Sequence, residues 1–172
     1  MTTEQPDGAP RPDEVDRIIA AWGRERPDLD LAPLAVMSRL TRLGRKLDLA
    51  RRQAFERNGL ESWEFDVLAA LRRAGAPYAL SPGALVTETM VTSGTMTNRV
   101  DRLVARGLVA RQPAPGDRRG VLVTICDEGL ARVDAAFTDL LAVERELLAP
   151  VPADEQPLLA ASLHGLLTQF DR

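Results

Sequence analysis

The stretch TSGTMTNRVDRLVARGLVARQPAPGDRRG, from Thr92 to Gly120, decides the fold. It holds six arginines and two aspartates, which gives it a net charge of +4 in a chain whose net charge is −3. Small polar residues precede the arginines, and glycines and prolines divide the second half. A basic surface in an acidic protein indicates a local site for an anionic partner, rather than a protein that coats nucleic acid without specificity.

The first part of this stretch predicts an amphipathic helix that is capped by Thr92 or Ser93 and closed by Gly107. One side of the helix is apolar and is expected to pack on the core: Met96, Val100, Leu103, Val104 and Gly107. The other side carries small and hydrogen-bonding residues: Gly94, Thr95, Asn98, Arg99, Arg102, Ala105 and Arg106. Such a face fits the major groove of DNA, where Asn pairs with adenine and Arg with guanine.

The flanking segments predict a helix-turn-helix followed by a β ribbon. Upstream, SPGALVTETM starts with Ser81 as N-cap and Pro82 at the first helical position, and a short turn separates it from the next helix. Downstream, the β-type runs LVARQ and VLVTI stand on either side of PAPGDRRG, which predicts a two-stranded ribbon with an exposed tip. This order of elements is typical of a winged helix-turn-helix.

The rest of the chain predicts further helices, so the expected fold is mainly α. Residues 1–12 are rich in proline and predict a disordered tail, and residues 13–60 predict two helices. Residues 61–126 predict the winged helix-turn-helix domain, whose first helix has Ser62 as its N-cap. Residues 127–172 predict two more amphipathic helices, which are separated at APVPADEQP.

The composition excludes several classes of protein. Apolar runs are far shorter than the roughly 20 residues of a membrane helix, and the N-terminus has no signal-peptide pattern. Cys126 is the single cysteine, so we expect no intrachain disulfide and a cytoplasmic location. Phosphate-binding glycine loops, metal-spaced His/Cys clusters and nucleophile triads are missing, which predicts no enzyme activity, no cofactor and no metal. The one histidine, His164, lies in an apolar stripe and is expected to be packed or at an interface.

The residues LSPGALVTETMVTSGTMTNRVDRLVARGLVARQPAPGDRRGVLVTICDEG resemble the winged helix-turn-helix of the MarR family of transcriptional regulators. The resemblance extends over about residues 33–170, and its most specific part is Asp117, Arg118 and Arg119, an apolar strand and then Gly129. It implies a homodimer, made by N- and C-terminal dimerisation helices, that binds a pseudo-palindromic DNA operator. We expect a repressor.

Eight residues are predicted to contact the duplex. Thr95, Asn98 and Arg102 are expected at base edges, and Ser93 and Thr97 at phosphates. Two further arginines at the tip of the ribbon, Arg118 and Arg119, are expected in or near the minor groove. Arg99 completes the set, and it is also a candidate for ligand binding.

A second resemblance concerns a ligand site. Regulators of a urate-responsive branch of the family carry an extra N-terminal helix with a Trp, and the matching residues here are Trp22, Asp66, Arg73 and Arg99. An aromatic plate beside guanidinium groups and a carboxylate suits a small anion such as urate or a small carboxylate. In the alternative interpretation, Trp22 packs the extra helix on the core, and Asp66 and Arg73 are surface charges.

Two other functions remain open from the sequence. The arginine-rich face fits a protein partner with an acidic surface as well as DNA, which would make the chain a winged-helix protein-protein interaction module. A one-cysteine redox-sensing regulator is the other, because Cys126 stands where the family usually has Thr. In the redox-sensing branch of the family the reactive cysteine lies in the N-terminal helices, so the resemblance favours an inert Cys126.

Overall fold

The computed structural model describes residues 11–114 and 116–170, and for residues 117–119 it describes the backbone alone. The described residues form two compact units, one that ends at Leu49 and one that begins at Ala50. Of the predicted tail at residues 1–12, residues 1–10 lie outside the described part of the chain.

The first unit contains α1 (Glu14–Glu25) and the first part of α2 (Ala32–Arg57). Asp13 is the N-cap of α1, and its carboxylate accepts hydrogen bonds from the backbone N–H groups of Val15 and Asp16, at 2.7 and 3.0 Å. Val15 is the one residue of α1 that is buried. The contact between α1 and α2 therefore depends little on apolar burial.

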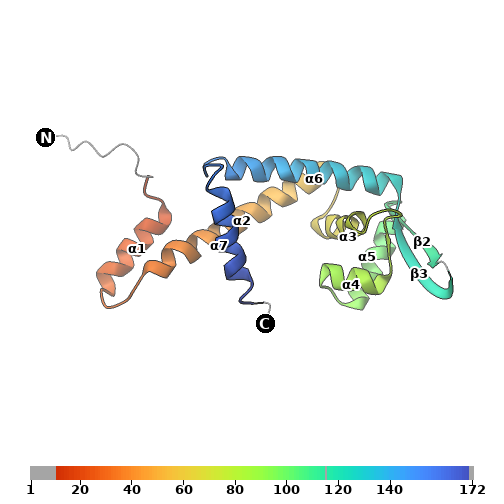
Figure 1. Cartoon of the computed structure of the whole chain (residues 1–172), viewed down its shortest axis with the longest axis horizontal. Coiled ribbons are helices and arrows are strands. Elements are labelled where there is room, and N and C mark those ends of the chain that lie inside the picture. Colours follow the sequence, from red (N-terminus) through yellow and green to blue (C-terminus); the bar gives the residue numbers. More distant parts are fainter. Residues whose placement is uncertain (1–10, 115, 171–172) are drawn as a thin grey trace. The chain divides into compact units, whose positions relative to one another are not determined.

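The second unit contains the end of α2 and all remaining elements: α3 (Ser62–Arg73), β1 (Ala79–Leu80), α4 (Pro82–Thr89), α5 (Ser93–Ala105), β2 (Val109–Ala114), β3 (Asp117–Ile125), α6 (Asp127–Leu148) and α7 (Gln156–Leu167). The helices α3, α4 and α5 cluster beside the hairpin of β2 and β3 (Figure 1). The predicted mainly α fold with a ribbon after the helix-turn-helix is confirmed.

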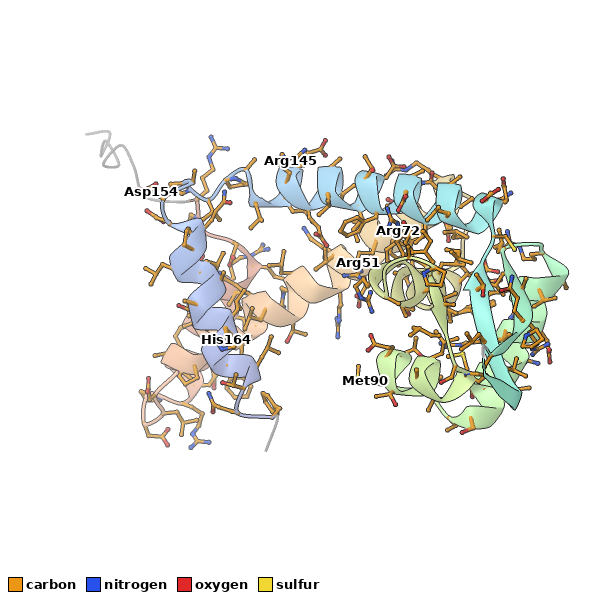
Figure 2. The ribbon with its side chains drawn as sticks, turned by 45° about the vertical axis from the view of Figure 1, so that its right-hand side comes forward. Arg51, Arg72, Met90, Arg145, Asp154 and His164 are labelled. Carbon is orange, nitrogen blue, oxygen red and sulfur yellow. The ribbon has the colours of Figure 1, made fainter. Side chains whose placement is uncertain are left out.

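Local side-chain chemistry sets the helix-turn-helix. Ser81 caps α4, since its hydroxyl accepts a hydrogen bond from the N–H of Ala84 at 3.2 Å, and Thr92 caps α5 by accepting from the N–H of Thr95 at 3.3 Å. Between them, Met90 ends α4 in the left-handed backbone region with φ 52°, at the turn labelled in Figure 2. The predicted N-cap of α4 is confirmed, and of the two candidates for α5 the N-cap is Thr92.

The wing belongs to a three-stranded antiparallel sheet in the order β1-β3-β2. Val109 pairs with Ile125 at the base of the hairpin, and Ala79 of β1 pairs with Thr124 on the other edge of β3. The sequence did not predict β1, because a strand of two residues is too short to show an alternating pattern.

The core lies among the helices and the base of the sheet. Phe55 of α2 stacks on Phe65 of α3, with ring centroids 4.0 Å apart. From α5 the core receives three buried side chains, Met96, Val100 and Leu103. Val104 was also predicted to pack there, but 37% of its surface is exposed. Successive residues of a helix are rotated by about 100°, so Val104, next to the buried Leu103, lies at the margin of the apolar side.

Gly129 in the first turn of α6 is required by a close backbone approach. A Cβ atom at this position would lie 2.2 Å from the carbonyl oxygen of Leu108, which also accepts a hydrogen bond from the N–H of Cys126 at 3.0 Å. The glycine of the predicted wing signature thus allows the start of α6 to pack on the start of β2.

One further prediction, the N-cap of α3, was wrong, and of the two alternatives for His164 only packing within the chain is excluded. The N-cap of α3 is Glu61, and Ser62 is already the first helical residue. Glu64 accepts a hydrogen bond from the backbone N–H of Glu61 at 2.9 Å, which satisfies one donor before the helix starts. His164 is not packed within the chain: it is exposed on α7 (Figure 2), a helix that has no buried residue.

Candidate nucleic-acid interface

The outer side of α5 presents hydroxyl and amide groups to solvent. Ser93, Thr95, Thr97 and Asn98 are all exposed. The hydroxyl of Thr97 donates to the backbone carbonyl of Ser93 at 3.0 Å, and the hydroxyls of Thr92 and Thr95 lie 2.9 Å apart. These bonds orient the hydroxyls, which can still accept a further hydrogen bond. The surface is free of carboxylates along the first two turns of the helix.

Two arginines of this face, Arg99 and Arg102, lie over the ring of Trp63 of α3. The guanidinium carbon of Arg102 is 4.6 Å from the centroid of the indole ring, and that of Arg99 is 5.7 Å away. Arg102 also donates to a carboxylate oxygen of Glu61 at 2.9 Å. The two arginines are therefore not loose on the surface; α3 positions them through an aromatic face and a carboxylate.

A buried ion pair fixes the C-terminal end of α5. Arg106 donates to the carboxylate of Glu64, whose side chain is fully buried, and to the backbone carbonyl of Gly59 at 2.7 Å. The other carboxylate oxygen of Glu64 is buried and has no hydrogen-bond partner among the described residues. A buried carboxylate needs a cation or hydrogen-bond donor beside it, and for Glu64 this group is Arg106. The ion pair therefore couples the orientation of α5 to the start of α3.

The wing continues the basic surface. Arg111 of β2 forms an ion pair with Asp101 of α5 at 2.6 Å, which joins the ribbon to the helix. Arg118 and Arg119 are near the start of β3, but their side chains lie outside what the structure describes. Near the tip the strand register shifts between Pro113 and Ala114. The wing therefore begins beside α5 and ends at the segment that carries these two arginines.

Two of the predicted ligand residues, Arg73 and Arg99, lie within electrostatic range of a third, Asp66. Partial desolvation raises the pKa of Asp66, and the positive charges of Arg51, Arg99 and Arg73 oppose that shift. Arg73 also forms an exposed ion pair with Glu88 at 3.4 Å. Sequence reasoning did not find Arg51, because it comes from α2 and meets Asp66 only in the folded chain.

Trp22, the fourth predicted ligand residue, belongs to the first unit. Half of its surface is exposed, so it is not packed in a core as the alternative interpretation expected. Together with Ile18, Ala21 and Glu25 it lines a shallow hollow on α1.

A cavity of about 330 Å³ lies between α2, α3 and α6. Apolar and charged side chains both line it: Arg51, Phe65, Ala69, Arg72, Arg73, Val133, Asp134, Phe137, Leu140 and Glu144. Arg72, which lies near Arg51 in Figure 2, pairs with Asp134 at 2.9 Å. Of the predicted ligand residues, Arg73 lines this cavity. The volume of the cavity is in the range of small-molecule binding sites.

Cys126 is half-buried at the N-cap of α6, and its side chain makes no capping hydrogen bond. Its backbone N–H donates to Leu108. The thiol is thus neither fully exposed nor enclosed.

A helix-turn-helix with an exposed polar second helix, followed by a basic ribbon, defines the class of winged helix-turn-helix DNA-binding proteins. A family model described as MarR family matches residues 58–120. The HTH-type transcriptional regulator PecS of Dickeya dadantii is 41% identical over 150 residues, which are 87% of this chain and 90% of that protein. The Multiple antibiotic resistance protein MarR of Salmonella typhimurium is 38% identical over 108 residues, 60% of this chain and 71% of that protein.

Among solved structures, a cysteine-to-serine mutant of MarR from E. coli complexed with operator DNA matches with a TM-score of 0.63 at 27% identity. The match covers 85% of this chain and 97% of that one. The chain belongs to the MarR family and is a DNA-binding transcriptional regulator, not an enzyme. Within the described ranges, none of the helices is both long and apolar enough to cross a membrane.

Proposed function

We propose that the protein binds a pseudo-palindromic operator as a homodimer, represses transcription there and leaves the DNA when a small anion binds. One observation carries the proposal: α5 is seated on the core by three buried residues while its opposite side exposes hydroxyl and amide groups with arginines beside them. A helix with these two sides is suited to enter a major groove.

The eight predicted DNA contacts divide by chemistry. Thr95, Asn98 and Arg102 contact base edges, because they follow one another along a single line on α5. Ser93 and Thr97 contact phosphates near the N-terminus of that helix, where free N–H groups add positive potential. Arg118 and Arg119 contact the minor groove or its phosphates. Arg99 serves the DNA, the ligand or the coupling between them.

Exposed apolar surface on the terminal helices supports a homodimer. In the second unit, α6 and α7 expose large apolar side chains, among them Phe137, Leu141, Leu147, Leu148, Leu158, Leu159 and Leu167. In the first unit, α2 exposes Val36, Met37, Leu43 and Leu49. Residues 13–60 and 127–172 would then provide the dimerisation helices and residues 61–126 the DNA-binding domain. Large exposed apolar side chains that gather on a few helices are typical of protein-protein interfaces.

The symmetry of a dimer sets the form of the operator. Two copies of α5 related by a two-fold axis read two inverted half-sites, whose centres are roughly 10 base pairs apart if the helices enter successive major grooves. MarR of E. coli, in the complex named above, binds operator DNA, which supports the same use of this fold here.

Charges around Asp66 support a small anionic ligand. Arg51, Arg73 and Arg99 all act on Asp66. Arg51 and Arg73 also pair with Glu144 and Glu88, at 3.9 and 3.4 Å, so a small anion would compete with these carboxylates for the two arginines. A planar anion such as urate, or a small carboxylate, can accept paired hydrogen bonds from a guanidinium group. Trp22, the fourth predicted ligand residue, would supply an aromatic surface for a planar anion. The ligand must favour the form that does not bind DNA.

Selection of bound duplexes from a random pool tests the operator, and Asn98→Ala tests the role of α5. We expect an inverted repeat from the wild type. Asn98→Ala should lose roughly 1–3 kcal/mol of discrimination at one base pair in each half-site. A uniform loss over all operator variants would make Asn98 a phosphate contact, and unchanged binding would reject α5 as the reading helix.

Repeating the binding measurement with urate and with small carboxylates tests the ligand. Release of the operator by one of these anions, and loss of that release in Asp66→Asn and Arg73→Gln, would support the proposal. Operator binding that no anion changes would reject the ligand part and leave the DNA part standing. Analytical ultracentrifugation at binding concentrations tests the dimer separately.

A further inference from the structure

Glu61, a residue outside the proposed set of DNA contacts, is in direct contact with one of them. Its two carboxylate oxygens have different partners: one accepts from Arg102 at 2.9 Å and the other from the indole N–H of Trp63 at 2.6 Å. Its backbone N–H donates to Glu64. Glu61 is thus fixed at the start of α3, with its charge directed to Arg102.

Arg102 has two partners at once. Its guanidinium group lies over the ring of Trp63 and is paired with Glu61, while about half of each ionic side chain remains exposed, 54% for Arg102 and 57% for Glu61. An exposed pair of this kind is weak and is screened by salt. It can therefore be broken by a stronger anionic partner without unfolding any element.

DNA phosphates are such a partner, but they also repel the carboxylate. An arginine that is paired with Glu61 adds no net positive charge to the surface, so it attracts phosphates less than a free arginine does. A guanine edge offers two acceptors in a plane that matches the guanidinium group, and it carries no full negative charge. When Arg102 leaves Glu61 for the DNA, a guanine edge is therefore a relatively better new partner than a phosphate.

We propose that Glu61 and Trp63 form a docking site for Arg102, and that Glu61 lowers the affinity of the protein for DNA of any sequence and thereby raises its specificity for the operator. This inference rests on the proposed function, because it requires α5 to face the duplex. Glu61 and Trp63 are positioning residues; they act through Arg102.

Glu61→Gln tests the proposal because it removes the charge and keeps the size of the side chain. Affinity for a random duplex should rise by roughly two- to fivefold, the range expected for one exposed ion pair. Affinity for the operator should rise less, so the specificity ratio falls. The slope of log K against log salt should become steeper by up to about 0.9, the value for one added phosphate contact.

Glu146→Gln is the matched control, because it makes the same charge change on α6, outside this cluster. Its random-duplex affinity should stay closer to that of the wild type. Weaker or unchanged binding by Glu61→Gln at unchanged thermal stability would overturn the proposal, as would an equal gain in the control, which would reduce the effect to net charge.

Arg102→Gln separates the inference from the proposed function. In this background Glu61→Gln should no longer raise affinity or change the salt slope, since the arginine it restrains is gone. A gain of the same size would show that Glu61 acts on the phosphates directly and would overturn the docking site. If Arg102→Gln and Asn98→Ala both leave DNA binding unchanged, the proposed function itself fails.

Trp63 provides a spectroscopic readout in a Trp22→Phe background, where it is the single tryptophan of the chain. Addition of operator should change the emission of Trp63, because Arg102 leaves the ring and the carboxylate. The change should be much smaller in Arg102→Gln, where Arg99 is the cation that remains over the ring. A change that persists at full size in that variant would contradict docking of Arg102 on this indole.

Discussion

The winged-helix region differs in burial from α1 and α7, the first and the last helix of the chain. In α5, Met96, Val100 and Leu103 are buried, whereas α7 has a more apolar sequence and no buried residue. In α1 the only buried residue is Val15. An apolar stripe thus predicts a helix and a side that needs covering, but it does not tell what covers it.

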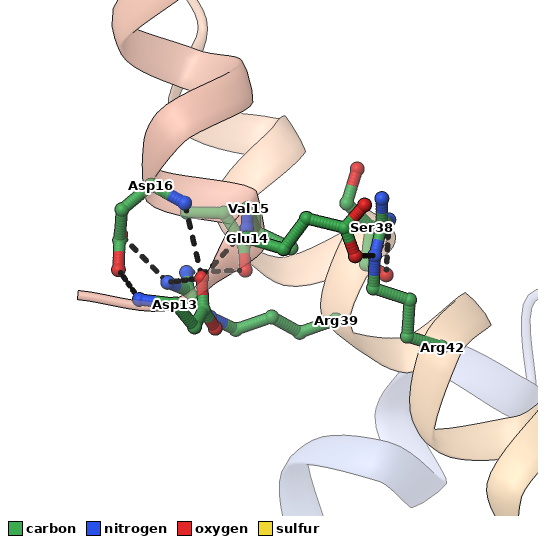
Figure 3. Close-up of polar contacts among 8 residues, drawn as sticks. Asp13, Glu14, Val15, Asp16, Ser38, Arg39 and Arg42 are labelled. Atoms are coloured by element: carbon green, nitrogen blue, oxygen red, sulfur yellow. Dashed lines mark hydrogen bonds and ion pairs between the residues drawn. The ribbon is translucent and has the colours of Figure 1, made fainter. Parts of the chain in front are cut away.

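The terminal helix α1 is attached by charge instead of burial. Its N-terminal carboxylates meet two arginines of α2: Arg39 pairs with Asp13 and Asp16 at 2.8 and 2.7 Å, and Arg42 pairs with Glu14 at 3.0 Å (Figure 3). All of these groups are exposed to solvent. The stability of the two regions should therefore respond differently to the loss of apolar and of charged groups.

The largest expected effect is the loss of a core leucine. Leu103→Ala should lower the free energy of unfolding by about 2–5 kcal/mol, because it leaves a cavity under α5. Leu158→Ala in α7, where 70% of the surface is exposed, should change the unfolding of the monomer little and should instead weaken dimerisation. Urea unfolding at several protein concentrations measures both. An equal loss of unfolding free energy in both variants under monomeric conditions would show that burial does not distinguish the two helices.

Next comes the contrast between a buried and an exposed ion pair. Arg106→Ala leaves the buried carboxylate of Glu64 without its cation and should cost about 3 kcal/mol of the free energy of unfolding. Arg42→Ala removes the partner of Glu14 on the exposed surface and should cost far less. Thermal unfolding of the two variants side by side is the measurement. A larger loss for Arg42→Ala would show that burial of Glu64 has no energetic weight.

The smallest effect is a pH dependence of the contact between α1 and α2. Hydrogen bonds from Arg39 and from the N–H groups of Asp16 and Val15 lower the pKa of Asp13 from 3.8 to about 2. Because the folded pKa is the lower one, the contribution of Asp13 is fully present above pH 3.8 and is lost as the pH falls through about 2. NMR titration of the carboxyl carbon should find this midpoint, and Arg39→Gln should raise it. A midpoint that Arg39→Gln leaves unchanged would exclude the ion pair as the cause.

Much of the fold was predictable because it is specified by local chemistry. Ser81 and Thr92 cap helices through their own hydroxyls, and the order of helix, turn, helix and ribbon follows from short-range patterns. The N-cap of α3 was misplaced because Glu61 and Ser62 are both able to cap, and the choice depends on Glu64 in the next turn. β1 was missed because its pairing with β3 spans more than 40 residues of sequence.

The candidate site was predictable in its residue types and not in its connections. The polar side of α5 follows from helical spacing, which places Thr95, Asn98 and Arg102 on one line. That Arg102 is paired with Glu61 has no signal in the sequence, because the two residues are 41 positions apart. For the same reason, the sequence predicted Arg73 and Arg99 as partners of Asp66 and missed Arg51.

The class of the protein, its helices and the side-chain chemistry of α5 follow from the sequence alone, since propensity, capping and apolar spacing act within a few residues. Only the tertiary structure decided which charges are free and which are paired. It buried Glu64 beneath Arg106 and placed Arg102 between Glu61 and Trp63. The interaction energy of a charge depends on its partners and on its exposure to water, and both are set by residues that are distant in the chain.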